Sequence, residues 1–205
     1  MQFNLDPTTL IVSIISILIG LTIHEAMHAY TGLKLGDDTA AEEGRVSFNP
    51  LRHIDPFTTV LLPIFTLVTL GAPILAAKPV PFNPARVKFE EFGAAMIAFA
   101  GPLSNLVLAI IGAAASKFFL NDPAVFNMIT IFTFINVSLF VFNLIPIPPL
   151  DGSRVLYAFA PDAVKDFMAS LEQFGIFIVF GLVLFVEPFR ESLSNVITGV
   201  VRFLL

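Results

Sequence analysis

Apolar residues fall into long runs that contain no charged side chain. About 20 apolar residues cross the hydrocarbon core of a bilayer, so each long run is a candidate membrane span. The runs cover residues 7–23, 56–77, 92–116, 123–150 and 173–186. The segment 188–205 is apolar from Ser192 onward except for Arg202, and it predicts either a further span or a helix lying in the membrane interface.

The second run, 56–77, is interrupted by Pro63, Gly71 and Pro73. Proline removes a helical hydrogen bond, so we expect a broken or re-entrant element there. Segments 44–51 and 77–84 alternate apolar residues with polar or proline residues and predict short β-like pieces. The expected fold is an all-α membrane protein, a polytopic helical bundle of about four to six spans, with these irregular pieces beside its functional site.

Composition makes the membrane assignment firm. The 205 residues include 11 Lys and Arg and 16 Asp and Glu, which is 13% charged, against about 25% in ordinary globular domains. Apolar types make up 56%, and the mean hydropathy is +0.87. A soluble domain of this size has too large a surface to hide so much apolar side chain. The chain is therefore expected to be integral to a lipid bilayer.

Charge and cysteine content exclude several function classes. The net charge is −5 with no basic run, which gives no basis for binding nucleic acid. The absence of cysteine excludes disulfides, thiolate metal sites and cysteine nucleophiles.

The distribution of basic residues predicts the orientation, because Lys and Arg gather on the cytosolic side. If run 56–77 re-enters, eight of the eleven basic residues lie on one side, which we expect to be cytosolic. These eight are Lys34, Arg45, Arg52, Lys78, Arg86, Lys88, Arg154 and Lys165.

The first run ends in His24-Glu25-Ala-Met-His28. Placing ionisable side chains in a membrane span costs free energy, so their presence there indicates a function. Residues i and i+4 share one helix face, so both imidazoles are placed to bind one metal ion. Glu25 points beside them, which suits a base for metal-activated water better than a ligand.

A hydrolytic zinc site usually has a third protein ligand. Asp151 stands out because it ends the long fourth run just after Pro146, Pro148 and Pro149, where unwound backbone can hold a carboxylate beside another helix. An Asp-Gly pair is also an ordinary turn signal, so the choice stays open at this point. The candidates are Glu42, Glu43, His53, Asp55 and Asp151.

Taken together, two motifs resemble those of the site-2 proteases, which are zinc intramembrane metalloproteases. They are His24-Glu25-x-x-His28 and Asn143-x-x-Pro-x-Pro-x-Leu-Asp151-Gly. Similar stretches occur at 44–50, 77–81 and 100–105, and the resemblance covers about residues 10–160. The sequence departs from many relatives at Met27, where they have glycine.

The resemblance implies roles for particular residues. His24, His28 and Asp151 would bind one zinc ion per chain, and Glu25 would activate the water. Asn143 would hold the substrate carbonyl or the developing oxyanion, although an interhelical polar contact is the alternative. For Asn105, in Gly-Pro-Leu-Ser-Asn, the alternatives are an interhelical contact and substrate binding.

The predicted function is hydrolysis of peptide bonds in or near transmembrane segments of membrane proteins, that is, regulated intramembrane proteolysis. We expect one integral-membrane protease domain over 1–205, a small form without extra regulatory domains, with C-terminal helices over 161–205. Its partners would be a transmembrane protein or peptide substrate and the lipid bilayer. The expected location is the plasma membrane of a prokaryotic cell, with the active site toward the cytosol.

A divalent-metal transporter that uses the His, Glu and Asp cluster is the alternative. Transporters usually show internal repeats and polar groups at the midplane of several helices. Here no repeat is visible, and the polar groups gather at the ends of two runs, which favours the protease.

Overall fold

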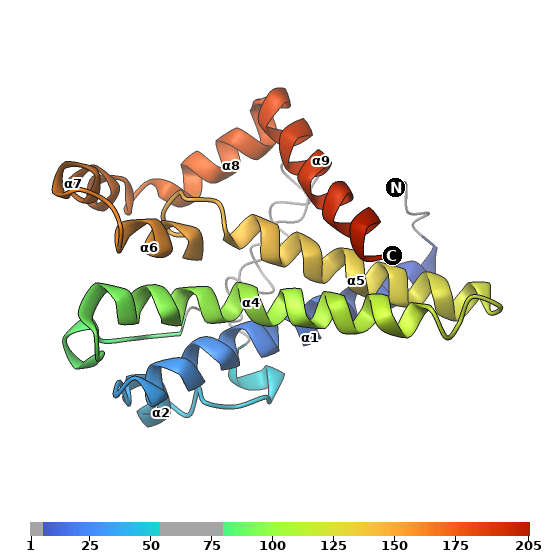
Figure 1. Cartoon of the computed structure of the whole chain (residues 1–205), viewed down its shortest axis with the longest axis horizontal. Coiled ribbons are helices and arrows are strands. Elements are labelled where there is room, and N and C mark those ends of the chain that lie inside the picture. Colours follow the sequence, from blue (N-terminus) through green and yellow to red (C-terminus); the bar gives the residue numbers. More distant parts are fainter. Residues whose placement is uncertain (1–5, 54–79) are drawn as a thin grey trace.

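The computed structural model describes residues 6–53 and 80–205 (Figure 1). Every regular element assigned in these two ranges is a helix. Three of them are long and apolar enough to cross a membrane: α1 (Pro7–Lys34), α4 (Glu90–Ser116) and α5 (Pro123–Asn143). A fourth span results if α7 (Asp162–Leu171) and α8 (Gly175–Phe185), bent by 79°, count as one. The chain is an integral membrane protein.

Local sequence signals set the helix starts. Asp6 caps α1 by accepting a hydrogen bond from the backbone N–H of Thr9, and Pro7 occupies the first helical turn. Asp122 caps α5 in the same way, with Pro123 next in the chain. Such carboxylates accept from backbone N–H groups that have no partner within the helix. Proline in the first turn costs no helical hydrogen bond, because the N–H that it lacks would have no partner there.

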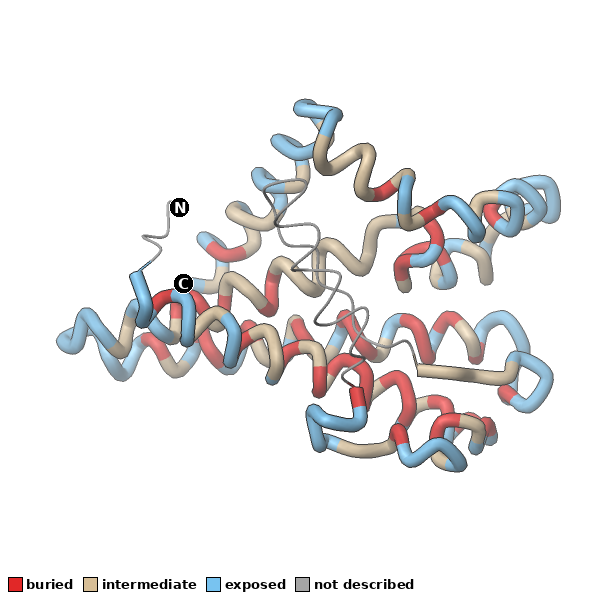
Figure 2. Tube along the Cα trace, turned by 180° about the vertical axis from the view of Figure 1, so that it is seen from behind, coloured by how far each residue is buried: buried red, intermediate tan, exposed pale blue. Residues whose placement is uncertain are grey.

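Helices α1, α4 and α5 pack against one another. The buried positions of α4 are largely small residues, which allows the helix backbones to approach closely. They include Gly93, Ala95, Ala98, Gly101, Ala109, Gly112 and Ala113. Figure 2 shows buried residues concentrated along these helices. Large apolar side chains such as Ile11 and Ile111 are exposed, as suits a lipid environment.

The C-terminal helices complete the described fold. After α5 the chain turns through a proline-rich loop into α6 (Asp151–Tyr157), which packs against α4. Helix α9 (Glu187–Leu204) packs against α5, where Val201 is buried beside Val137. Helix α9 has 18 residues but carries four charged side chains, and it is not among the described helices that are apolar enough to span a membrane.

Two expectations about the fold need correction. Segment 44–51 contains no strand: it makes a turn and the 3-10 helix η1 (Pro50–Arg52). In 77–84 only Val80 onward is described; this part is likewise not a strand and leads into η3 (Pro84–Arg86). In both places an asparagine caps the turn that the next proline starts, so the backbone curls instead of forming a ladder.

The described part of the chain does not by itself support the expected number of spans. Its helices supply three spans, or four with the bent pair, so the range of about four to six is reached only at its lower end. The predicted re-entrant element at 56–77 lies outside the described residues.

Candidate metal centre

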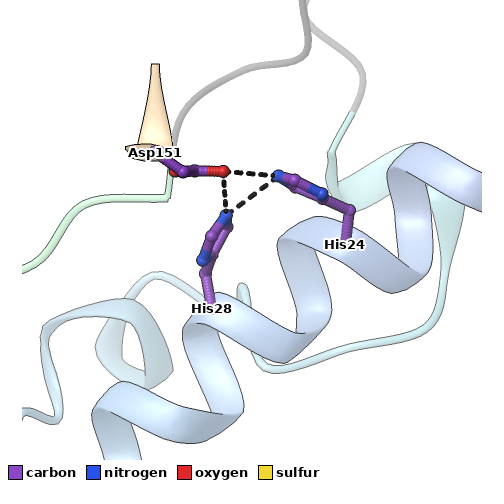
Figure 3. A group of neighbouring side chains, drawn as sticks. All are labelled: His24, His28 and Asp151. Carbon is purple, nitrogen blue, oxygen red and sulfur yellow. Dashed lines mark hydrogen bonds and ion pairs between the residues drawn. The ribbon is translucent and has the colours of Figure 1, made fainter. Parts of the chain in front are cut away.

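Three side chains from two helices converge on one point (Figure 3). His24 and His28 lie one turn apart on α1, and both are buried, at 3% and 8% exposed. Asp151, the first residue of α6, points its carboxylate at both rings. Its Oδ2 lies 3.0 Å from His24 Nε2 and 3.3 Å from His28 Nε2, and the two Nε2 atoms are 3.0 Å apart.

Hydrogen bonds on the far side of each ring fix which nitrogen carries the proton. The Nδ1 of His28 lies 2.7 Å from the carbonyl oxygen of Ile97, and a carbonyl only accepts, so this nitrogen is the donor. The Nδ1 of His24 lies 2.7 Å from Asn105 Oδ1 and donates to it. In the neutral imidazole, the form that binds metal, each Nε2 then directs a lone pair at the space it shares with Asp151.

The three converging atoms fit a metal ion. Asp151 Oδ2 is buried and has no hydrogen-bond partner in the described part of the chain, and the Nε2 atoms of two imidazoles face it. Three lone pairs so close repel one another unless a cation lies among them. Tetrahedral zinc with bonds of about 2.0–2.1 Å places its ligand atoms about 3.3 Å apart, close to the edges of this triangle. The set of two nitrogens and one oxygen is also typical of catalytic zinc, which keeps a fourth position open.

The charges of the three side chains also suit a metal ion. A metal binds the ionised form of a carboxyl group and the neutral form of an imidazole, so Asp151 would bring one negative charge and the two histidines none.

Two glycines allow the groups to come together. A Cβ at Gly101 would lie 2.4 Å from His28 Nε2 and 2.7 Å from His24 Nε2, so only glycine fits beside both rings. A Cβ at Gly152 would lie 2.2 Å from the carbonyl oxygen of Leu144. Glycine after Asp151 therefore lets the proline-rich loop fold tightly enough to present the carboxylate.

The catalytic candidate Glu25 lies in the same stretch of α1. It is 8% exposed, and it forms no hydrogen bond or ion pair with the described residues. A buried carboxylate without such a partner remains available to a water or a substrate. Met27, the departure from many relatives, is only partly buried, whereas Ala26 is buried, so the larger side chain is accommodated at the edge of the packed face.

Asn143 and Asn105 occupy different kinds of place. Asn143 lies at the C-terminal end of α5 and donates one amide hydrogen to the carbonyl of Leu139 at 3.0 Å. Its second amide hydrogen has no partner among the described residues, so the predicted substrate contact stays a prediction. Asn105 is fully buried behind His24 and uses both amide hydrogens on neighbouring helices, which leaves no donor for a substrate.

The other candidates for the third ligand lie elsewhere. In the described ranges, His24, His28 and Asp151 form the one group of three possible ligands within 4.8 Å of one another. Glu42 and Glu43 are exposed, and the His53 ring donates to a backbone carbonyl six residues earlier. Asp55 lies outside the described residues.

Sequence reasoning missed two groups that support the site. The carbonyl of Ile97 orients His28, and a backbone carbonyl leaves no trace in residue type. Asn136 lies within an apolar helix and is 0% exposed. A polar residue inside a span is itself a signal for a functional contact, so this one could have been found.

Comparison with known proteins agrees with the geometry. Residues 120–186 match the family described as Peptidase family M50. The chain is 39% identical over 184 residues to YwhC of Bacillus subtilis, which covers 85% of this chain and 80% of the relative. It is 30% identical over 190 residues to Rip2 of Mycobacterium tuberculosis (strain Erdman), covering 91% and 70%. The names of both relatives describe zinc metalloproteases.

A third relative is similar over a shorter stretch of the chain. MJ0611 of Methanocaldococcus jannaschii is 32% identical over 154 residues, covering 75% of this chain and 73% of the relative. No solved structure matches the chain.

A buried triad of two histidines and an aspartate on membrane helices, together with these relatives, defines a zinc-dependent membrane metalloprotease. More specifically, the chain belongs to peptidase family M50, the site-2 protease family. The resemblance predicted from the motifs is confirmed, and zinc is the cofactor.

Proposed function

We propose that this chain hydrolyses peptide bonds within or beside transmembrane segments of other membrane proteins, as regulated intramembrane proteolysis requires. The observation that carries the proposal is the depth of the metal ligands along an apolar helix. Helix α1 has 28 residues, about 42 Å at 1.5 Å per residue. His28 lies 21 residues after Pro7, about 32 Å from the start of the helix.

This depth matters because the hydrocarbon core is about 30 Å thick. A slab of that thickness centred on α1 extends from about 6 to about 36 Å along the helix, so both histidines lie inside it near one edge. A peptide bond reaching these ligands would come from a chain that is itself in the membrane or at its boundary.

The residues divide the chemistry between them. His24, His28 and Asp151 would hold the zinc, which when bound supplies Lewis acidity that makes water a nucleophile near neutral pH. Glu25 takes the proton of the attacking water and delivers it to the departing amine. Asn143 donates its free amide hydrogen to the carbonyl oxygen of the substrate, where negative charge develops.

The basic residues support a site toward the cytosol, in the plasma membrane of a prokaryotic cell. Lys34 ends α1 on the same side as the metal ligands, and Arg45 and Arg52 follow it. Arg154 lies on α6 close after Asp151. Under the preference of Lys and Arg for the cytosolic side, this end of the bundle is cytosolic.

The Glu25→Gln variant tests the proposal. It keeps the zinc ligands, so zinc content should stay at that of the wild-type protein while cleavage is lost. The readout is mass spectrometry of peptide fragments released from the membranes of the native cell, wild type against Glu25→Gln, with zinc measured on the purified proteins. Equal fragment sets in both strains would refute the proposal. A loss of metal transport without any change in fragments would favour the transporter instead.

A further inference from the structure

Buried amides form a line of hydrogen bonds across the crossing of α1, α4 and α5 that ends on a metal ligand. Asn136 Nδ2 donates to the carbonyl of Phe132 at 2.9 Å. Asn105 Nδ2 donates to Asn136 Oδ1 at 3.2 Å and to the carbonyl of Gly20 at 3.1 Å. Asn105 Oδ1 then accepts from His24 Nδ1 at 2.7 Å.

Every amide in this line has one possible orientation. The oxygens of Gly20 and Phe132 are backbone carbonyls, which only accept, so the two asparagine nitrogens must face them. The oxygen of Asn105 is then left to face His24, and the imidazole nitrogen there must carry its proton. The orientation of the His24 ring therefore depends on Asn105, and the amide of Asn105 is itself held by Gly20 and Asn136.

The surroundings of Asn105 and Asn136 protect their hydrogen bonds from solvent. Asn105 and Asn136 are both 0% exposed, so water does not compete for their hydrogen bonds. A Cβ at Gly20 would lie 3.0 Å from Asn136 Oδ1, so the absence of a side chain there lets the amides reach across. His28 is oriented differently, by the backbone carbonyl of Ile97, which side-chain substitution does not remove.

We propose that Asn105 and Asn136 are positioning residues of the metal centre. Asn105 holds the His24 ring in its orientation and tautomer, and Asn136 holds the amide of Asn105. The inference rests on the proposed role of His24 as a metal ligand. It assigns a task to the Gly-Pro-Leu-Ser-Asn motif other than helix packing or substrate contact.

Metal affinity tests the proposal without any substrate. The purified protein in detergent, freed of metal, is titrated with Co²⁺ against a competing chelator, and the visible absorption of the bound ion reports ligand geometry. Asn105→Leu should weaken Co²⁺ binding by about 10- to 100-fold and alter the absorption bands, as loss of a partner behind a ligating histidine does. Asn105→Asp keeps an oxygen acceptor and should restore much of the affinity.

Further variants separate positioning from packing. Asn136→Leu leaves Asn105 in place but unheld, so we expect a loss smaller than that of Asn105→Leu. The matched control is Thr133→Val, one turn earlier on α5. Thr133 is equally buried and its hydroxyl has no hydrogen-bond partner among the described residues, so its replacement should leave Co²⁺ binding unchanged.

Two results would overturn the inference, and a third concerns the site itself. If Asn105→Leu lowers the melting temperature but binds Co²⁺ with the wild-type affinity and spectrum, the residue only joins helices. If Asn105→Leu does not fold, a wild-type Co²⁺ affinity and spectrum in Asn136→Leu overturns the proposal that the two asparagines position His24. A His24→Ala variant that binds Co²⁺ as tightly as the wild type would refute the metal site, and with it the proposed function.

Discussion

Asp37 and Asn83 are 46 positions apart in the chain, yet the backbone N–H of Asn83 donates to Asp37 Oδ2 at 2.7 Å. The other carboxylate oxygen accepts from the backbone N–H of Thr39 at 3.1 Å and from its hydroxyl. Asp37 is 0% exposed and lies just after α1. One carboxylate thus fixes the end of the helix that carries the metal ligands to the segment that precedes α4.

Replacing Asp37 by Asn should lower the free energy of unfolding by about 1–3 kcal/mol, because an amide presents a donor to a buried N–H that needs an acceptor. The measurement is thermal unfolding in detergent near pH 7, with a chelator in both samples so that metal does not contribute. Asp162→Asn, an exposed carboxylate at the start of α7, serves as the control and should change little.

The same pair predicts a pH dependence. Burial raises the pKa of Asp37, but hydrogen bonds from Thr39 and Asn83 and the charge of Arg86 outweigh it and lower the pKa below its ordinary value. A lowered folded-state pKa means stabilisation that is complete above the unfolded-state value of about 3.9 and is lost as the pH falls through the folded-state value. The stability difference between wild type and Asp37→Asn should therefore shrink below about pH 4. A difference that stays constant into that range would contradict this assignment.

Gly101→Ala should abolish zinc binding. Its methyl group would lie 2.4 Å from His28 Nε2 and 2.7 Å from His24 Nε2, so the rings must move apart or the side chain fills the metal position. Zinc per chain, measured on purified protein, should fall to background. Gly181→Ala on α8, where an added Cβ meets nothing within 4 Å, is the matched control and should keep its zinc.

Asn143→Leu should lower the rate of peptide cleavage by about 10²–10³ while zinc content stays unchanged, because the variant removes only a donor to the developing negative charge. Asn143→Asp should be as slow, since an ionised carboxylate has no hydrogen to donate. Cleavage is followed on a substrate found by the fragment comparison. If Asn143→Leu cleaves at the wild-type rate, the side chain serves helix packing instead.

Removal of zinc should destabilise the protein by mass action. A ligand that binds only the folded state adds about 2.7 kcal/mol when free ligand is 100 times its dissociation constant. A chelator should therefore lower the melting temperature of the wild type. An Asp151→Ala variant, which lacks one ligand, should melt at the same temperature with and without the chelator.

The parts of the site that follow from helix periodicity could be predicted from the sequence. His24 and His28 share a face because four residues make about one turn, and that holds in any surrounding. Asp151 was less certain from physics alone, since a proline-rich loop gives no direction to the carboxylate that follows it. The resemblance to a family, not the spacing, singled it out.

The errors have a common physical origin. Alternation at 44–51 and 80–84 has the period of a strand, but the prolines at positions 50 and 84 lack the N–H that a ladder needs and start 3-10 turns. The sequence left two roles open for Asn105, an interhelical contact and substrate binding, because a buried amide can serve either. Its hydrogen bonds to His24 and to the carbonyl of Gly20 favour the interhelical contact.

The proton positions on the two histidines also set the electrical balance of the centre. If each ring binds the metal through Nε2 and keeps its single hydrogen on Nδ1, both imidazoles are neutral. Asp151 and Glu25, when ionised, bring two negative charges to a buried region of the protein. A divalent cation brings the group to zero net charge, the state that is least costly to keep in a low-dielectric medium. Electroneutrality thus selects the charge of the ion as firmly as the nitrogen and oxygen donors select its chemistry.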